Sequence, residues 1–437
     1  MYRKYKHKIL FLLIGLVYSA VFYNGYIEFL NGWFDYAGFL IIEGRRENLP
    51  FFILSFFFCI LPLLFYNGFN RISSFLSIFI YYLLYVPIIL TFFFNLEGSA
   101  LYVSYLQFLF VLSMIILFKA DKFVLKIKFR LPGDFDVFKF VLFACGFLTL
   151  YVAFVYRDNL EFVGFDHVYE HRSSNEQLGA DVFTGYLSVW LHNVLIPICL
   201  SYSLFAKKKL YFIVATISAI IIYMATAAKS VLLFPLIFLA IFWFLKKRSL
   251  NYAFLSIGIV LSVVLVTTLF TGFSEFTSLL WMRTVGNGGY LTKFYHDFFE
   301  TNPITYYTHI NVVNAITNGY PYDKTLGEVV GNFYWNDANT NANFWATDGI
   351  AALGDFGILF SSVLLFFLFV IFNTITVNYN KLFLILILIP YSLALLNASL
   401  FSSLVTGGGF LVFGFLMLNS TQNNKYIMIN ENNTDNL

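Results

Sequence analysis

The sequence predicts an all-α, polytopic membrane protein with about 12 transmembrane helices, and three observations support this fold class. Of the 437 residues, 59% are hydrophobic and only 12% are charged, whereas about 25% are charged in an average soluble domain. The mean hydropathy is +0.76. The apolar residues also form long continuous runs, unlike the short alternating strands of an outer-membrane barrel. A soluble globular fold and a barrel are therefore both excluded.

Each predicted span is an apolar run of roughly the length that a helix needs to cross a bilayer, about 20 residues. The first run follows a basic stretch, but because many further spans come after it we expect an uncleaved span and not a cleaved signal. An even number of spans in a single transmembrane domain places both termini on one side. The runs lie near residues 9–30, 50–67, 72–95, 100–119, 136–156, 186–206, 210–228, 230–245, 251–272, 348–372, 382–399 and 401–418.

The distribution of basic residues orients these spans, because short cytoplasmic loops retain Lys and Arg. With the N-terminus inside, residues 119–130, 207–209 and 246–248 and the polar tail 419–437 are cytoplasmic. Of the 27 basic residues, 19 then lie inside. The eight that lie outside are Arg45, Arg46, Arg157, Arg172, Lys229, Arg283, Lys293 and Lys324.

Two outer loops are long, at residues 157–185 and 273–347. The second is rich in Tyr, Phe and Trp, so we expect it to be ordered. Within it, Tyr290, Phe294 and Phe298 recur every four residues and would form one apolar stripe on a helix. Such a helix either lies at the membrane interface beside a lipid-borne substrate or packs against the bundle.

Several function classes have no support in the sequence. The formal charge of +3 is too balanced to indicate nucleic acid as a partner. The cysteines Cys59, Cys145 and Cys199 lie in apolar runs, so we expect small core side chains and neither disulfides nor a metal site. No phosphate-binding glycine loop and no zinc-type histidine spacing is present. We therefore expect no cofactor, no metal and no nucleotide-driven reaction.

Cations on the outer side are candidates for phosphate binding. Arginine binds phosphate oxygens with two parallel hydrogen bonds, which makes Arg157, Arg172 and Arg283 candidates. Alternatively, these arginines pair with nearby carboxylates such as Asp158, Glu161, Asp297 or Glu300. Lys229 lies between two apolar runs and either provides a second cation or extends to the lipid headgroups.

Histidines and aspartates supply candidate bases. His167, His171, His296 and His309 fall in the outer loops, where a histidine can accept a proton near neutral pH. His192 falls within a span, where we expect a hydrogen bond across helices.

Asp348 and Asp355 open the tenth span seven residues apart, and we expect them on one helical face. Alternatively, Asp348 is a carboxylate at a helix start. Gly349, Gly354 and Gly357 favour close helix packing.

Residues 281–360 resemble the Wzy-type O-antigen and oligosaccharide repeat-unit polymerases. The shared elements are an arginine (Arg283), a Tyr-x-Asp-Phe-Phe stretch (295–299) and Asn302-Pro303. They continue with His309, Pro321-Tyr322, Gly331 with Tyr334, Asn341-Ala342-Asn343, Asp348-Gly349 and Gly354-x-x-Gly357. The Ala-Lys-Ser turn at Lys229 is also similar to one in this family.

The resemblance implies a GT-C-like membrane glycosyltransferase of lipopolysaccharide or related polysaccharide biosynthesis. Such an enzyme polymerises repeat units carried on undecaprenyl pyrophosphate at the outer face of the bacterial cytoplasmic membrane. It implies membrane lipid and the lipid-linked oligosaccharide as partners, with a chain-length regulator as a further possible one. The alternatives are an O-antigen ligase, which transfers the glycan to lipid A, and a flippase for lipid-linked oligosaccharide.

The chemistry of the candidate residues suits this reaction. Arg283 and Lys229, with Arg157 and Arg172, would stabilise the pyrophosphate leaving group. His309, Asp297 or Asp348 would deprotonate the acceptor hydroxyl, with His309 preferred because its pKa needs the smallest adjustment. Tyr295, Asn341 and Asn343 would contact sugars.

Overall fold

The computed structural model describes residues 2–125, 136–164, 182–246, 250–335, 338–340, 344–420 and 427. Throughout these residues the regular structure is helical, apart from an isolated bridge at Tyr379. An all-α membrane protein is thus confirmed at the level of fold class.

The chain divides into two compact units. Unit 1 comprises Met1–Leu125, Asn251–Asn373 and Leu395–Leu400, and unit 2 comprises Lys126–Leu250, Thr374–Ala394 and Phe401–Leu437. Residues far apart in sequence therefore share a unit. In particular, the predicted outer loop 273–347 folds with the first four predicted spans.

Unit 1 contains all or most of twenty helical segments. These are α1 (Tyr2–Gly25), η1 (Tyr26–Leu30), α2 (Asn31–Phe34), η2 (Asp35–Ala37), α3 (Leu49–Ile60), η3 (Leu61–Phe65), α4 (Ile72–Ile80), η4 (Tyr81–Tyr85), α5 (Val86–Asn95), α6 (Ala100–Lys119), η5 (Ala120–Lys122), α13 (Leu250–Thr271), α14 (Glu275–Ser278), η8 (Leu279–Gly286), α15 (Asn287–Thr301), α16 (Asn311–Thr317), α17 (Leu326–Tyr334), η9 (Phe344–Asp348), α18 (Gly349–Leu353) and α19 (Asp355–Ile375).

Unit 2 contains the remaining described helices. They are α7 (Val137–Val155), η6 (Arg157–Asn159), α9 (Val182–Trp190), η7 (Leu191–Leu195), α10 (Ile196–Ala206), α11 (Lys209–Thr226), α12 (Lys229–Leu245), α20 (Lys381–Asn397), α21 (Leu400–Leu404) and α22 (Gly409–Ser420).

Seven helical stretches of the described chain are long and apolar enough to cross a membrane. They are His7–Ala37, Ile72–Asn95, Ala100–Lys122, Val137–Val155, Phe183–Ala206, Lys209–Thr226 and Asp355–Ile375. Five shorter apolar helices, Leu49–Phe65, Lys229–Leu245, Ile257–Thr271, Lys381–Asn397 and Gly409–Asn419, coincide with the other predicted spans. A multi-pass membrane protein is supported by these helices, and the number of 12 crossings stays a prediction.

Two predicted spans have different boundaries from those expected. The tenth begins at Asp355 because Gly354 adopts a positive φ of +61°, which ends α18. The last is divided into α21 and α22 around Gly407 and Gly408, the latter with a φ of +85°. Such left-handed backbone is easily adopted only by glycine, so hydropathy alone could not locate these breaks.

Several long helices of the described chain contain a π-helical segment, among them η1, η4 and η7. Two of these segments directly precede a proline near the start of the following helix, Pro87 in α5 and Pro197 in α10. Proline cannot donate a backbone hydrogen bond and its ring crowds the preceding turn, so a locally wider turn allows the helix to continue.

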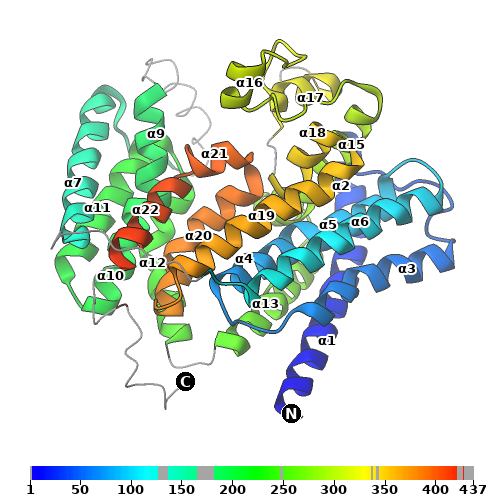
Figure 1. The fold of residues 1–437 in the computed structure, drawn as a ribbon, viewed down its shortest axis with the longest axis horizontal. Helices are drawn as coiled ribbons and strands as arrows, with labels where there is room; N and C mark the ends of the chain where they lie inside the picture. The colour runs from blue at the N-terminus through cyan, green and yellow to red at the C-terminus, as the bar shows by residue number, and fades with distance from the viewer. Residues whose placement is uncertain are drawn as a thin grey trace. The chain divides into compact units, whose positions relative to one another are not determined.

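The predicted outer loop 273–347 is largely helical. Figure 1 shows α16 and α17 together at one end of unit 1, near α15 and α18. α15 is the central element, because it packs against α5, η8, α17 and α18. Gly288 and Gly289 allow this close approach: a Cβ at either position would overlap the chain at Leu84 or Pro87.

The stripe of Tyr290, Phe294 and Phe298 on α15 is buried within the protein, with 3–6% of each side chain exposed. Tyr290 stacks on Phe39, and Phe294 contacts Tyr334 edge to face. Of the two interpretations of this stripe, packing against the rest of the fold is therefore the one that the structure supports. The three cysteines are also buried and unpaired, as predicted.

Candidate functional site

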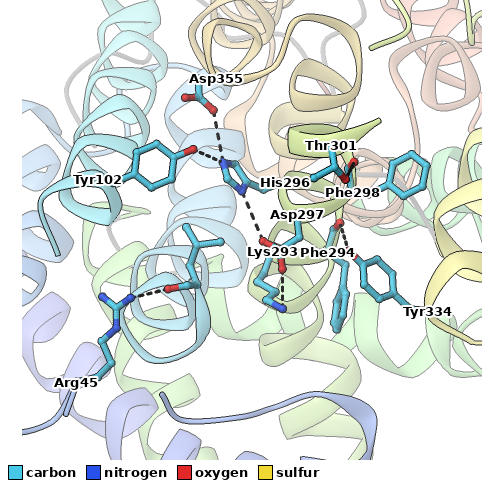
Figure 2. A network of polar contacts seen from close by, with 11 residues as sticks. Arg45, Tyr102, Lys293, Phe294, His296, Asp297, Phe298, Thr301, Tyr334 and Asp355 are labelled. Atoms are coloured by element: carbon cyan, nitrogen blue, oxygen red, sulfur yellow. Dashed lines mark hydrogen bonds and ion pairs between the residues drawn. The ribbon is translucent and has the colours of Figure 1, made fainter. Parts of the chain in front are cut away.

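The face of α15 next to the aromatic stripe carries a second stripe, of the ionisable residues Lys293, His296, Asp297 and Glu300. Spacings of three and four residues place them on one face of the helix. Figure 2 shows His296 between two carboxylates, Asp297 from the same helix and Asp355 from the start of α19. We call Lys293, His296, Asp297, Asp355 and Tyr102 of α6 the His296 cluster.

The geometry of the cluster centres on the imidazole. His296 Nε2 lies 3.2 Å from the hydroxyl of Tyr102 and 3.5 Å from Oδ1 of Asp355. His296 Nδ1 lies 3.6 Å from Oδ1 of Asp297, which is an ion-pair distance longer than a hydrogen bond. The second oxygen of Asp297 accepts a short contact of 2.7 Å from Nζ of Lys293. His296 thus links three helices of unit 1.

The charges of the cluster explain why a histidine is stable at this position. Burial by itself would lower the pKa of the imidazole, but the two neighbouring carboxylates outweigh it and raise the pKa of His296 to about 9. The imidazole is therefore positively charged at neutral pH. Two cations, Lys293 and His296, then balance the two carboxylates, so the group carries no large net charge into the protein.

The members of the cluster differ in access to solvent. The His296 side chain is 4% exposed, whereas Asp297 is 24% and Asp355 is 33% exposed. The cation is therefore enclosed and its carboxylates face outward. Both carboxylates are therefore partly accessible to solvent.

The segment that leads into α6 is held by a buried arginine. Arg45 Nη2 donates hydrogen bonds of 2.7 and 2.9 Å to the carbonyl oxygens of Leu96 and Gly98. Tyr102 follows within the first turn of α6. Figure 2 shows Arg45 with one of these hydrogen bonds as a dashed line. Arg45 uses its guanidinium to hold the backbone, and in this it differs from the exposed arginines that are candidates for phosphate binding.

A second histidine–aspartate pair lies in the core of unit 1. His309 Nε2 is 3.2 Å from Oδ1 of Asp348, and the two side chains are 3% and 0% exposed. The other ring nitrogen, Nδ1, is 2.7 Å from the hydroxyl of Thr305. Oδ2 of Asp348 accepts a hydrogen bond from the backbone N–H of Leu400, the first residue of α21. Asp348 directly precedes α18 but its side chain makes no capping hydrogen bond to that helix, and it accepts instead from the start of α21.

The expectation that Asp348 and Asp355 share one helical face is wrong. The positive φ of Gly354 breaks the helix between them. Gly349 and Gly357 then meet backbone to backbone, since a Cβ on either would overlap the other residue. Close packing is confirmed for these two glycines, whereas Gly354 serves the turn and has open space around its Cα. As a result each aspartate pairs with a different histidine.

The turn that carries His309 is held against α18 by its backbone. The N–H groups of Thr305 and Tyr306 donate to the carbonyl oxygens of Ala351 and Ala352, at 2.8 and 3.0 Å. Tyr306 and Tyr307 have φ angles of +48° and +63°, a region that costs a non-glycine residue about 1–3 kcal/mol. The surrounding contacts thus impose this conformation, and with it the position of His309.

The other predicted site residues of unit 1 take different positions. Arg283 lies on η8 and is exposed. Tyr295 is buried, 0% exposed, with its hydroxyl 3.4 Å from the carbonyl oxygen of Thr340. In this conformation Tyr295 presents no surface to a sugar. Its position in the core follows from its place on α15, where it faces away from the ionisable stripe.

Several motif residues have packing roles around α15. The Tyr322 hydroxyl donates to the carbonyl oxygen of Pro303 at 2.6 Å. The Tyr334 ring contacts Phe294, and Gly331 lies so close to Ala338 that a Cβ there would overlap its backbone. The motifs thus shape the helical segment that presents the His296 cluster.

Two predicted cations of unit 2, Lys229 and Arg157, lie at helix ends. Lys229 is the first residue of α12, after a turn in which Ala227 has a φ of +51°. Arg157 is 58% exposed and pairs with Asp158 at 3.7 Å, and its guanidinium also lies over the ring of Phe154. For Arg157, pairing with a nearby carboxylate was the alternative interpretation, and this contact is present.

The Nε2 atom of His192 lies 3.1 Å from the hydroxyl of Ser230, on α12. The predicted hydrogen bond across helices is confirmed. Arg172, His167, His171, Asn341 and Asn343 lie outside the described residues.

Sequence reasoning placed His296, Asp297 and Asp355 among candidate acids and bases but missed their association with Lys293 and Tyr102. The spacing of Lys293, His296 and Asp297 on one helix was a usable signal for part of the cluster. Tyr102 is 194 residues from His296, so only the tertiary fold could bring them together. Within the described ranges, no group of three or more His, Cys, Asp or Glu side chains is arranged to hold a metal ion.

A scan against protein-family models found no matching family, and searches of curated proteins and of solved structures found no match. The resemblance to repeat-unit polymerases therefore depends on the sequence motifs alone.

Proposed function

We propose that this chain is a membrane glycosyltransferase that polymerises oligosaccharide repeat units carried on undecaprenyl pyrophosphate. The product would be O-antigen or a similar surface polysaccharide, made at the outer face of the bacterial cytoplasmic membrane. One observation carries the proposal: the motif-bearing segment packs around α15 and leaves the carboxylates of the His296 cluster open to solvent, in a chain with helices apolar enough to span a membrane.

The proposed reaction transfers the growing glycan to an acceptor hydroxyl. The bond between the anomeric carbon and the pyrophosphate oxygen breaks, and its electron pair leaves with the pyrophosphate. The acceptor oxygen forms the new bond to the anomeric carbon and gives its proton to a base. We expect inversion at this carbon. Cations must stabilise the leaving group, and Arg283, which belongs to the same unit as the His296 cluster, is the proposed source.

Among the proposed bases, Asp297 is the most accessible in the structure. It is 24% exposed and held by Lys293, whereas His309 and Asp348 are enclosed and face each other. A base must come within hydrogen-bond reach of the hydroxyl that it deprotonates. Catalysis by His309 or Asp348 would therefore require the turn at residues 305–309 to open. We propose Asp297 as the base in the conformation described here.

The first experiment deletes the gene in the source bacterium and analyses the lipid-linked glycans. Loss of a polymerase leaves single repeat units attached to lipid A, whereas loss of a ligase or flippase leaves none. Single units would support the proposed function. Absence of all repeat units, or chains of normal length, would contradict it.

The second experiment tests the exposed cation. Arg283→Lys keeps the charge but loses the paired hydrogen-bond geometry, so complementation should give shorter glycan chains at unchanged protein level. Arg46→Lys is the matched control, because Arg46 is also an exposed arginine in a predicted outer loop. Normal chains from an Arg283→Ala strain would exclude a role of Arg283 in pyrophosphate binding.

A further inference from the structure

We propose that His296 is the residue that positions Asp297 for glycosyl transfer, by joining it to Asp355 across α15 and α19; the proposal rests on the function proposed above. His296 is enclosed and cannot contact the substrate directly, since its side chain is 4% exposed. It acts through its neighbours. Its role is to fix the distance and orientation of the carboxylate that takes the proton.

The contacts of His296 make it the junction of the site. Each ring nitrogen faces a different carboxylate, at 3.6 Å for Asp297 and 3.5 Å for Asp355. The hydroxyl of Tyr102 holds the Nε2 side at 3.2 Å. The ring of Phe92, from α5, covers the imidazole at a centroid distance of 6.1 Å. Rotation of the imidazole would break several contacts at once, so its orientation is determined.

Two carboxylates so close to one imidazole require its positive charge. The ionisable groups that face His296 are Asp355 from α19, Tyr102 from α6, and Asp297 with its partner Lys293 from α15. Glu300 is exposed one turn further along α15. When His296 loses its proton, both carboxylates lose a shared cation. Asp297 then retains only Lys293, a flexible side chain, and its orientation is less restricted.

A pH dependence of the chemical step follows. The pKa of His296 is raised to about 9 by the carboxylates, so the positioned form predominates at neutral pH and is lost above that value. Turnover should therefore fall on the alkaline side. Because the substrate does not touch His296, KM should change little, and the loss should appear in kcat.

The experiment measures kcat and KM against pH in purified enzyme reconstituted into liposomes. The substrate is the native lipid-linked repeat unit, extracted from a strain that lacks the polymerase. His296→Gln should lower kcat by about 100-fold, the order expected for a misplaced catalytic group. It should also abolish the fall of kcat at high pH, which we call the alkaline limb of the pH profile. His7→Gln, at the predicted cytoplasmic end of α1, is the matched control and should leave both parameters unchanged.

Asp355→Asn tests the same link from its more exposed end. It removes one of the two carboxylates, so the alkaline limb should move to lower pH while the fold is retained. The combined variant should be no slower than His296→Gln, because both changes break one linkage. Wild-type kcat with an unchanged alkaline limb in His296→Gln, or fully additive losses, would overturn the positioning role.

A measurement that needs no activity separates this proposal from the proposed function. Histidine ring resonances of the wild-type protein, assigned with His296→Gln, should show one imidazole titrating near pH 9. Asp355→Asn should lower that pKa. An ordinary histidine pKa in the folded protein would overturn the proposal even if polymerase activity is found. If the pKa of His296 is raised but the protein has no polymerase activity, the link between His296 and the two carboxylates is supported and the proposed glycosyl transfer is excluded.

Discussion

Replacing Gly349 with alanine should disturb both histidine–aspartate pairs through one steric contact. Gly349 and Gly357 meet backbone to backbone, and a Cβ at Gly349 would overlap the carbonyl oxygen of Gly357. Backbone cannot move aside as a flexible side chain can, so α18 and α19 must separate. Asp348 immediately precedes Gly349, and Asp355 begins α19, so both carboxylates would move with their helices.

The size of the effect follows from two opposing terms. Overpacking in a close contact costs about 1–3 kcal/mol, and the upper end applies because the overlap is with backbone. Alanine in place of glycine in a helix returns up to about 1 kcal/mol. The net loss in the free energy of unfolding should therefore be about 2 kcal/mol for Gly349→Ala.

Gly146→Ala provides the matched control. Gly146 lies inside α7, and a Cβ added there would meet no other atom within 4 Å, so the substitution should stabilise by up to about 1 kcal/mol. Chemical denaturation of both variants in the same detergent gives the comparison, with a difference of about 3 kcal/mol expected. If Gly349→Ala were as stable as Gly146→Ala, the close packing of α18 on α19 would be refuted.

The orientation of the chain and the two histidine–aspartate pairs lead to three further predictions. A cysteine at the exposed Asn318 should react with an impermeant thiol reagent in intact cells, whereas labelling only after the membrane is opened would reverse the predicted orientation. His309→Ala removes a neighbour of the buried Asp348 and should lower the free energy of unfolding by about 1–3 kcal/mol; unchanged stability with turnover reduced by about 10² to 10⁴ would restore His309 as the base. The pKa of His296 is about 9 in the folded protein and about 6.5 when unfolded, so its contribution of about 3 kcal/mol is complete below the lower value and is lost as pH rises to the higher one. Thermal melts of the wild type and His296→Gln should thus converge towards alkaline pH, and parallel curves would contradict the charge pairing.

The apolar runs were sufficient to predict the helices because their signal is local. Each run from 9–30 to 401–418 contains an apolar helix in the structure. The breaks at Gly354 and Gly408 were not predicted, since a glycine within an apolar run is equally compatible with helix packing. The aromatic stripe at Tyr290 was ambiguous for a similar reason: lipid and protein interior are both apolar, so periodicity cannot distinguish them.

The ionisable residues were predicted by type but not by partner. His309, Asp297 and Asp348 were chosen because each can accept a proton, and sequence separation gave no information on which would be enclosed. The sequence favours His309 because a histidine is the residue type best suited to accept a proton near neutral pH, yet the structure encloses it between Thr305 and Asp348. Accessibility is a tertiary property, and here it reverses the preference in favour of Asp297.

The turn at Gly354 explains how two aspartates only seven residues apart come to serve different purposes. On a continuous helix both would face one environment. With the helix broken at Gly354, Asp348 is carried into the core, where one carboxylate oxygen lies 3.2 Å from Nε2 of His309 and the other accepts from the N–H of Leu400. These partners matter because burial of an unpartnered carboxylate is costly. Asp355 stays half-buried at the start of α19 and shares His296 with Asp297. The buried pair of His309 and Asp348 therefore fixes the turn of residues 305–309 on α18. The carboxylates of the His296 cluster remain partly accessible to solvent. The proposed glycosyl transfer requires such accessible carboxylates, so we propose the His296 cluster as the place to test it.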